Sequence, residues 1–206
     1  AAAEGFYKRI SGITSDSQGF QNQFEFTNST GRYTVTGCEI LLQKKFNRFY
    51  GWASYSYNDN NYYFEGFLPP DFANNFAVSH AVTSAGIYEW NKLRIALGAK
   101  WRTGTPFTEP ESFSIDPNNP ANSQINYRKP NSTALDDNIH LNLSASKTWD
   151  LGKKTFFSAS CSVLNILDRK NVINRYYRIN TSSNTIESVN TYGLGRTPNV
   201  SLKMLF

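Results

Sequence analysis

The sequence predicts an all-β fold, an antiparallel up-and-down transmembrane β-barrel to which this chain contributes about eight strands. Three observations lead to this prediction. Apolar and polar residues alternate in several segments with the period of a β-strand. Short and long connections between these segments also alternate, from the first to the last. The polar sides are rich in Ser, Asn and Thr with some basic residues, a composition typical of a water-filled barrel interior.

The cleanest strand patterns lie in the second half of the chain. In segment 138–149 one side is apolar and is interrupted only by Lys147. Segments 92–102 and 154–165 and the last residues up to Phe206 alternate in the same way. We predict that these apolar sides face lipid. The residues concerned include Leu93, Ile95, Leu97, Trp101, Leu141, Leu143, Trp149, Val200, Leu202 and Met204.

Earlier segments alternate less regularly. Strands are expected at 5–12, 32–45, 49–62 and 77–88. In the second of these the apolar side runs through Cys38 and Ile40, whereas Tyr33 and Val35 have the opposite parity. Because Gly37 lies where the parity changes, the pattern suggests a β-bulge at that residue.

The connections orient the chain. Tight links are expected at 47–48, 89–91 and 150–153, and long polar links at about 13–31, 63–76, 103–137 and 166–195. Outer-membrane barrels have short periplasmic turns and long extracellular loops. Counting back from Phe206, the last strand descends toward the periplasm and the first strand rises, and an even number of strands satisfies both ends. We therefore expect Phe206 at the periplasmic rim.

Composition and charge argue against several other classes of protein. The net charge is +5 and the basic residues are scattered, so no nucleic-acid-binding face is expected. No apolar run approaches the roughly 18–20 residues of a spanning helix. Cys38 and Cys161 lie on apolar sides of strands that the predicted order separates, so we expect no disulfide between them. Residues 1–4 lack the features of a signal peptide, which suggests processing or a longer parent protein.

A soluble β-sandwich would alternate as well, because each of its strands also has one apolar side. Two features favour the barrel. The polar sides have the composition of a wet interior, and Tyr88, Trp101 and Trp149 lie at strand ends, where an interfacial aromatic girdle is expected.

Candidate binding residues fall into two groups. Segment 58–68, expected to be a loop, carries aromatic rings that could stack on sugars or chelator rings or simply lie at the membrane interface; they are Tyr62, Tyr63, Phe64 and Phe67. Arg94, Lys100 and Arg102 share the polar side of one strand and would attract an anionic ligand. The alternative is that these three cations pair with carboxylates or line solvent.

The sequence carries no convincing catalytic set. His80 and His140 stand alone, without the spacing of metal ligands. Asp136 and Asp137 near His140 are more typical of a solvated loop rim than of an acid–base pair. We therefore predict no enzyme activity, no cofactor and no metal site.

The last part of the chain resembles a known family. Val163-Leu-Asn-Ile-Leu-Asp-Arg-Lys-Asn171, Arg175-Tyr-Tyr177 and Gly195-Arg-Thr-Pro-Asn-Val-Ser-Leu-Lys-Met-Leu-Phe206 resemble the closing strands of TonB-dependent outer-membrane receptors of the Bacteroidetes type. Two upstream pieces resemble the same family. They are Gly37-Cys-Glu-Ile-Leu-Leu42 followed by Tyr55-Ser-Tyr57, and Trp101-Arg-Thr-Gly-Thr-Pro-Phe-Thr108.

The resemblance implies active import of a nutrient, such as a metal chelate, an oligosaccharide or a peptide. It implies a wall of about 22 strands around an N-terminal plug, on which the TonB energy-transducing complex pulls. Residues 1–206 would form the C-terminal part of the barrel domain, since no plug is present in the sequence. Residues 5–12 would then pair with preceding strands, and Phe206 resembles a barrel-assembly signal.

The implied partners are outer-membrane lipid, the remaining barrel and plug of the same receptor, the TonB complex through that plug, and a surface lipoprotein. Two alternatives stay open. One is a self-contained eight-strand barrel with a structural or adhesive role. The other is a barrel enzyme with an Asp, His or Ser cluster at its outer rim.

Overall fold

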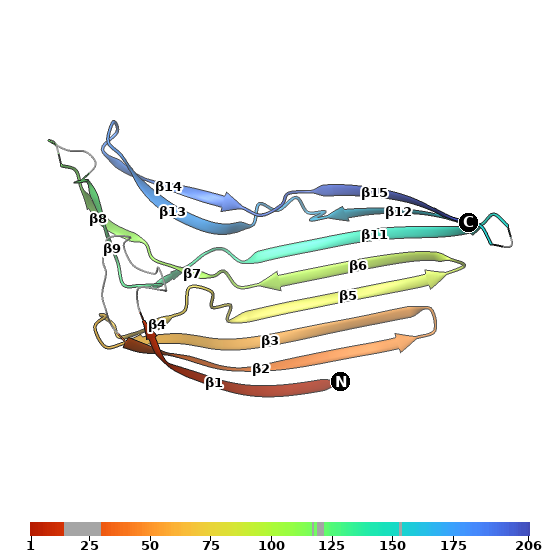
Figure 1. Cartoon of the computed structure of the whole chain (residues 1–206), viewed down its shortest axis with the longest axis horizontal. Coiled ribbons are helices and arrows are strands. Elements are labelled where there is room, and N and C mark those ends of the chain that lie inside the picture. Colours follow the sequence, from red (N-terminus) through yellow and green to blue (C-terminus); the bar gives the residue numbers. More distant parts are fainter. Residues whose placement is uncertain (15–29, 117, 119–121, 153) are drawn as a thin grey trace.

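A computed structural model describes residues 1–14, 30–116, 118, 122–152 and 154–206 of the chain. The described residues form an all-β structure built around one large antiparallel sheet (Figure 1). Most of the predicted connection 13–31 lies outside these residues, and so does Lys153 at the end of the predicted connection 150–153.

The sheet is a meander in which each long strand pairs with the long strands before and after it in the chain. Its order is β1-β2-β3-β5-β6-β11-β12-β15, and the short strand β4 pairs with β3. The bounds are β1 (Ala2–Thr14), β2 (Thr30–Phe46), β3 (Phe49–Phe64), β4 (Asp71–Ala73), β5 (His80–Trp90), β6 (Leu93–Arg102), β11 (Asn138–Asp150), β12 (Phe156–Leu164) and β15 (Thr197–Leu205). The predicted all-β class and antiparallel meander are thus confirmed.

The sheet does not close on itself. β1 and β15 lie at its two ends, and within the described part of the chain they do not pair with each other (Figure 1). The described residues therefore form an open sheet with two edges, not a closed barrel.

The connections alternate in length as predicted. Short turns after β2, β5 and β11 lie at one end of the sheet, called the tight-turn end below (Figure 1). The opposite end, called the loop end, carries the long connections. The β5–β6 turn differs slightly from the prediction, because β5 continues to Trp90 and the turn residues are Asn91 and Lys92. Both have positive φ, at 47° and 61°, as in a type I′ hairpin turn.

Two of the long connections contain strands of their own. The predicted loop 166–195 contains a hairpin of β13 (Val172–Asn180) and β14 (Thr185–Tyr192). The predicted loop 103–137 contains β7 (Pro106–Phe107) paired with β10 (Thr133–Ala134), and β8 (Pro110–Ser114) paired with β9 (Gln124–Tyr127). The two long connections lie where the sequence predicted them, but the short strands inside them were not predicted.

The strand register gathers the apolar side chains on one face. Leu143 pairs with Leu97 on β6 and with Val163 on β12. Cys161 pairs with Val200, so the same face continues onto β15. Because paired residues project to the same side of a sheet, this apolar face extends from β6 across β11 and β12 to β15. It includes all the residues that the sequence assigned to lipid: Leu93, Ile95, Leu97, Trp101, Leu141, Leu143, Trp149, Val200, Leu202 and Met204.

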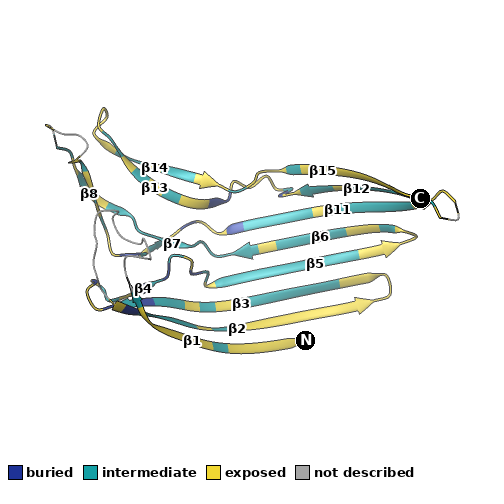
Figure 2. Ribbon diagram, in the orientation of Figure 1, coloured by how far each residue is buried: buried dark blue, intermediate teal, exposed yellow. Residues whose placement is uncertain are grey.

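Much of the apolar face is uncovered. Leu97 is 47% exposed, Leu202 67% and Val200 77%. The hydrophobic core of the described residues lies elsewhere, in a small aromatic cluster at the loop end near β3 and β4 (Figure 2). The main sheet therefore buries little apolar surface within this chain.

The predicted bulge at Gly37 is wrong. The pairing of β2 with β1 and β3 passes through Gly37 without a shift, and the irregularity lies instead opposite β2 at Ser11/Ile13, where Gly12 has φ +80°. Gly37 meets a different need. A Cβ there would lie 2.3 Å from the carbonyl oxygen of Tyr57 and 2.6 Å from the Phe6 ring.

Candidate functional site

The predicted aromatic loop is a small hydrophobic core. β3 continues to Phe64, and the rings of Tyr62, Phe64 and Phe67 are at most 4% exposed. They pack with Phe72, with ring centroids 5.4–6.2 Å apart. The expectation that these three rings are presented from a loop is wrong, since their neighbours cover them.

The fourth predicted aromatic residue, Tyr63, projects to the opposite side of β3. It pairs with Arg32 on β2, and the Arg32 guanidinium carbon lies 3.9 Å from the centre of the Tyr63 ring. Tyr63 is therefore engaged in a cation–π contact with a neighbouring strand of the same sheet. Tyr33 explains the change of parity in β2, because its ring packs on Tyr62 at 5.6 Å on the polar face.

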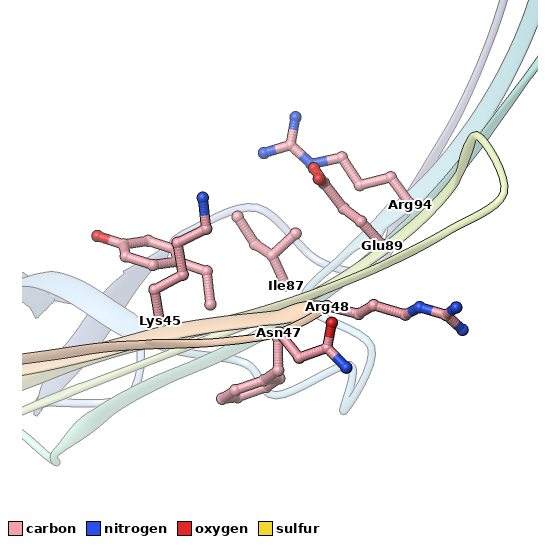
Figure 3. A pocket seen from close by; sticks show the side chains of 8 residues that line it. Lys45, Asn47, Arg48, Ile87, Glu89 and Arg94 are labelled. Atoms are coloured by element: carbon pink, nitrogen blue, oxygen red, sulfur yellow. The ribbon is translucent and has the colours of Figure 1, made fainter.

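The three predicted basic residues do not form one strip. Arg94 lies at the tight-turn end, where its Nε is 3.5 Å from a Glu89 carboxylate oxygen. Both line a hollow of about 350 Å³ on the polar face, shared with Lys45 and Ile87 (Figure 3). Arg94 precedes Lys100 by six residues on β6, which corresponds to about 20 Å along a strand.

Lys100 and Arg102 lie near the loop end of the polar face. Lys100 pairs with Thr83 and His140, and Arg102 pairs with Ala81 and Asn138. Among the ion pairs of the described residues, none includes these two cations. These two cations leave positive charge on the polar face next to the loop end. This charge remains suited to binding an anionic ligand.

Loop-end segments contact one another through polar side chains. The Asn131 amide nitrogen donates to the carbonyl oxygen of Ala73 at 2.7 Å and to Asn75 Oδ1 at 2.5 Å. Its backbone N–H donates to Thr108 Oγ1 at 3.0 Å. The connection between β3 and β5 is thus tied to the connection between β6 and β11.

The β13–β14 hairpin joins the same assembly. The guanidinium carbon of Arg175 lies 5.1 Å from the centre of the Phe107 ring, and Arg175 Nε donates to Asn190 Oδ1 at 2.7 Å. Burial raises the pKa of Tyr127 on β9, and the nearby Tyr177 of β13 raises it further. Aromatic and cationic groups from two separate connections therefore meet here, in a combination able to stack on a planar or anionic ligand.

Two buried asparagines fix the base of the hairpin. Asn165 donates through Nδ2 to the carbonyl oxygens of Arg169 and Leu194, both at 3.0 Å, and accepts the Arg169 N–H through Oδ1 at 3.2 Å. Asn171 accepts the Ile139 N–H at 2.9 Å and donates to the Ile139 carbonyl at 2.8 Å. Asn171 thereby supplies hydrogen-bond partners for the backbone of Ile139 on β11, at a point where β12 has already ended. The side chains of Asn165 and Asn171 are both nearly inaccessible to solvent.

The hairpin also carries a charged contact. Asn180 Nδ2 donates to Glu187 Oε1 at 2.6 Å, and Arg178 pairs with Glu187 at 2.8 Å. These hydrogen bonds, the one from Asn180 first and then that from Arg178, lower the pKa of Glu187. Glu187 is therefore ionised at neutral pH and stabilises the hairpin end.

The two histidines project to opposite faces. His80 lies on the apolar face, where its Nδ1 is 2.8 Å from the Tyr55 hydroxyl and its ring is 5.2 Å from that of Tyr57. His140 lies on the polar face beside Asn171. Within the described ranges, no group of three or more His, Cys, Asp or Glu residues could hold a metal ion. None of the described segments is a helix long and apolar enough to cross a membrane.

The sequence predictions missed the residues that join the loop-end segments: Phe107, Tyr127, Asn131, Arg175 and Tyr177. A local signal for two of them existed. Segments 172–180 and 185–192 are rich in β-branched and aromatic residues, and the Thr-Ser-Ser-Asn between them favours a turn. The contacts of Asn131 join residues distant in sequence and have no local signal.

Comparisons of the chain with protein-family models, with curated protein sequences and with solved structures find no match.

Proposed function

We propose that the chain is the C-terminal part of the barrel wall of a TonB-dependent receptor in the bacterial outer membrane. The receptor takes up a nutrient, which is a metal chelate, an oligosaccharide or a peptide. The observation that carries the proposal is the uncovered apolar face, continuous over the long strands from β2 to β15. An aqueous protein surface rarely exposes so large an apolar area, whereas a bilayer covers it without cost.

The length of the strands supports this position. Each of the eight long strands has 9–17 residues, and a tilted spanning strand needs about 9–11 residues. On β11, Trp149 lies ten residues from Ile139, the partner of Trp101. Ten residues cover about 33 Å along a strand, or roughly 25 Å across the bilayer at a tilt near 40°, which matches the usual apolar band.

Aromatic residues mark both limits of that band on the apolar face. Near the tight-turn end lie Phe46, Phe49, Tyr88, Trp90, Trp149 and Phe157. Tyr55, Tyr57 and Trp101 lie toward the loop end. Aromatic rings favour the interface between lipid and water. Phe206 then lies at the periplasmic rim, on the side of the tight turns.

The open edges support a wall that continues beyond this chain. β1 and β15 each have one side without a neighbouring long strand in the described residues. Unpaired backbone groups are costly in lipid, so a spanning sheet needs neighbours on both edges. A wall of about 22 strands supplies them. The family resemblance of residues 163–171 and 195–206 supports this assignment over a small closed barrel.

The edges can be tested by cysteine cross-linking in isolated outer membranes, with Cys38 and Cys161 replaced by Ser. Glu4→Cys is combined in turn with Asn199→Cys, Ser201→Cys and Lys203→Cys, which lie on the polar face of β15. Ser160→Cys with Ser201→Cys is the positive control, because these two residues are paired. We expect only the control to cross-link; a cross-link from position 4 to β15 indicates the self-contained eight-strand barrel instead.

Transport is tested by deleting the complete receptor gene. Growth is compared with a ferric catecholate or hydroxamate as iron source, an oligosaccharide as carbon source or a peptide as nitrogen source. We expect the deletion strain to lose growth on one of these nutrient sources. Uptake of that nutrient should require both the receptor and the TonB complex. A receptor in which a short Gly-Ser linker replaces residues 172–192 should insert normally into the outer membrane but should take up less of this nutrient. Unchanged uptake of every source after deletion contradicts the proposal.

A further inference from the structure

Two lysines break the apolar face, and both lie close to the tight turns. Lys147 interrupts the apolar side of β11, and Lys44 that of β2. Each is followed two residues later by an aromatic residue on the same face, Phe46 after Lys44 and Trp149 after Lys147. The same arrangement therefore occurs twice, on strands that run toward the same rim.

The surroundings of Lys147 show which way its side chain extends. It pairs with Leu93 on β6 and with Ala159 on β12, so its stem lies among apolar neighbours. Its Nζ donates to the carbonyl oxygen of Asn91 in the β5–β6 turn. The ammonium thus reaches the tight-turn end while the stem stays on the apolar face, which is how lysines extend from apolar surface toward water.

The positive charge of these lysines is not neutralised within the described part of the chain. Lys44, Lys147, Arg48 and Lys154 are absent from its ion pairs. The two nearby carboxylates already have partners, since Glu89 pairs with Arg94 and Asp150 with Lys92. The rim therefore carries several unpaired cations.

Aromatic residues lie close to both lysines on the same face of the sheet. Trp149 stacks on Phe157 with ring centroids 5.6 Å apart. Phe46 pairs with Phe49 beside Lys44. Such rings lie at headgroup depth in a bilayer, with acyl chains against the apolar residues beyond them.

We propose that the tight-turn rim of the apolar face binds the phosphate of anionic phospholipid headgroups, with Lys147 as the main contact and Lys44 as a second one. The inference rests on the proposed membrane position of the sheet. Charge complementarity and the adjoining apolar surface favour a lipid over free phosphate, because only a lipid satisfies both. One lysine near an anionic bilayer surface corresponds to a preference of about fivefold.

The test uses the whole protein in bilayers, with every tryptophan except Trp149 replaced by Phe. Quenching of Trp149 by brominated phosphatidylglycerol is compared with quenching by brominated phosphatidylcholine. We expect a relative binding constant of about five in favour of phosphatidylglycerol. Lys147→Gln should reduce this ratio to near one. Lys203→Gln is the matched control, because Lys203 lies at the same rim on the polar face, and it should leave the ratio unchanged.

The other outcomes separate the two proposals. Equal quenching by both lipids in the parent protein overturns the headgroup site but leaves the membrane position intact. No quenching by either lipid contradicts the membrane position as well. A third outcome concerns free phosphate. If the preference for phosphatidylglycerol is lost when inorganic phosphate replaces chloride at equal ionic strength, the lysines bind free phosphate and the lipid assignment is overturned.

Discussion

Replacing Leu143 by Arg tests the environment of the apolar face. On β11, Leu143 lies six residues from Trp149 and four from Ile139, so it falls near the middle of the proposed apolar band. Its side chain is 41% exposed, so the new guanidinium would project into whatever medium covers the face. In lipid at this depth an arginine costs about 2–4 kcal/mol.

A cost of this size lowers the folding equilibrium constant by roughly 30- to 1,000-fold. Ser144→Arg is the matched control, because Ser144 is the next residue on the same strand and faces the opposite side, paired with Ala96 and Ser162. If the polar face lines a wet interior, this control should change the stability by no more than about 0.5 kcal/mol.

The assay is guanidinium-dependent folding of the protein into lipid vesicles, followed by tryptophan emission. We expect the midpoint to fall markedly for Leu143→Arg and to move little for Ser144→Arg. Equal, small changes in both variants would refute the reasoning, because they would show that both faces meet water. Where the arginine variant does not fold at all, Leu143→Asn gives a smaller change in the same direction.

Three further predictions concern residues with defined contacts in the structure: Asn165, Gly37 and Glu187. Asn165→Ala should destabilise the protein by about 2–4 kcal/mol through the loss of three side-chain hydrogen bonds at a buried site, with increased proteolysis of the β13–β14 hairpin; Asn199→Ala, at an exposed position, is the control. Gly37→Ala should lower the unfolding midpoint, because its Cβ would meet the Tyr57 carbonyl; an unchanged midpoint would count against the tight packing there. The pKa of Glu187 is lowered in the fold, so its stabilisation of the hairpin is complete above the ordinary carboxyl pKa and is lost as the pH falls through the lowered value. Carboxyl NMR shifts should show this, and Asn180→Ala should move the pKa of Glu187 upward.

The main strands could be predicted because each separates two environments. The alternation at 138–149 corresponds to β11, and residues assigned to one side in separate segments lie on one face once the register is known. The period of two fixes which residues share a side of a strand. It does not fix the neighbours of that strand, but the tight turns, as at Asn91 and Lys92, bring consecutive strands together.

The loop end was much less predictable. Tyr33 departs from the apolar side of β2 because the polar face buries an aromatic core there, not because the strand bulges at Gly37. Local patterns distinguish apolar from polar sides, but they do not reveal that a side changes its role along a strand. The same limit applies to Phe64, which a local pattern assigns to a binding loop and the fold buries.

The candidate site was predicted only in part. Lys100 and Arg102 share the polar face near the loops, but Arg94 on the same strand lies at the other end beside Glu89. Parity places three residues on one side, whereas strand length decides whether one ligand can reach them. The contact of Arg175 with Phe107 depends on how two long connections fold against each other, which no local pattern contains.

The most direct test of the central claim is the environment of two adjacent residues on opposite faces of β12. Cys161 pairs with Ala145 and Val200 on the apolar face, and Ser160 pairs with Ser146 and Ser201 on the polar face. Spin labels are attached at Cys161, or at Ser160→Cys in a Cys161→Ser background, in each case with Cys38 replaced by Ser. Their collision rates with oxygen and with a water-soluble nickel complex are then measured in bilayers. We predict that the label at 161 meets oxygen but not nickel, and that the label at 160 shows no such preference for oxygen. Free access of nickel to both labels would contradict a lipid-facing apolar face.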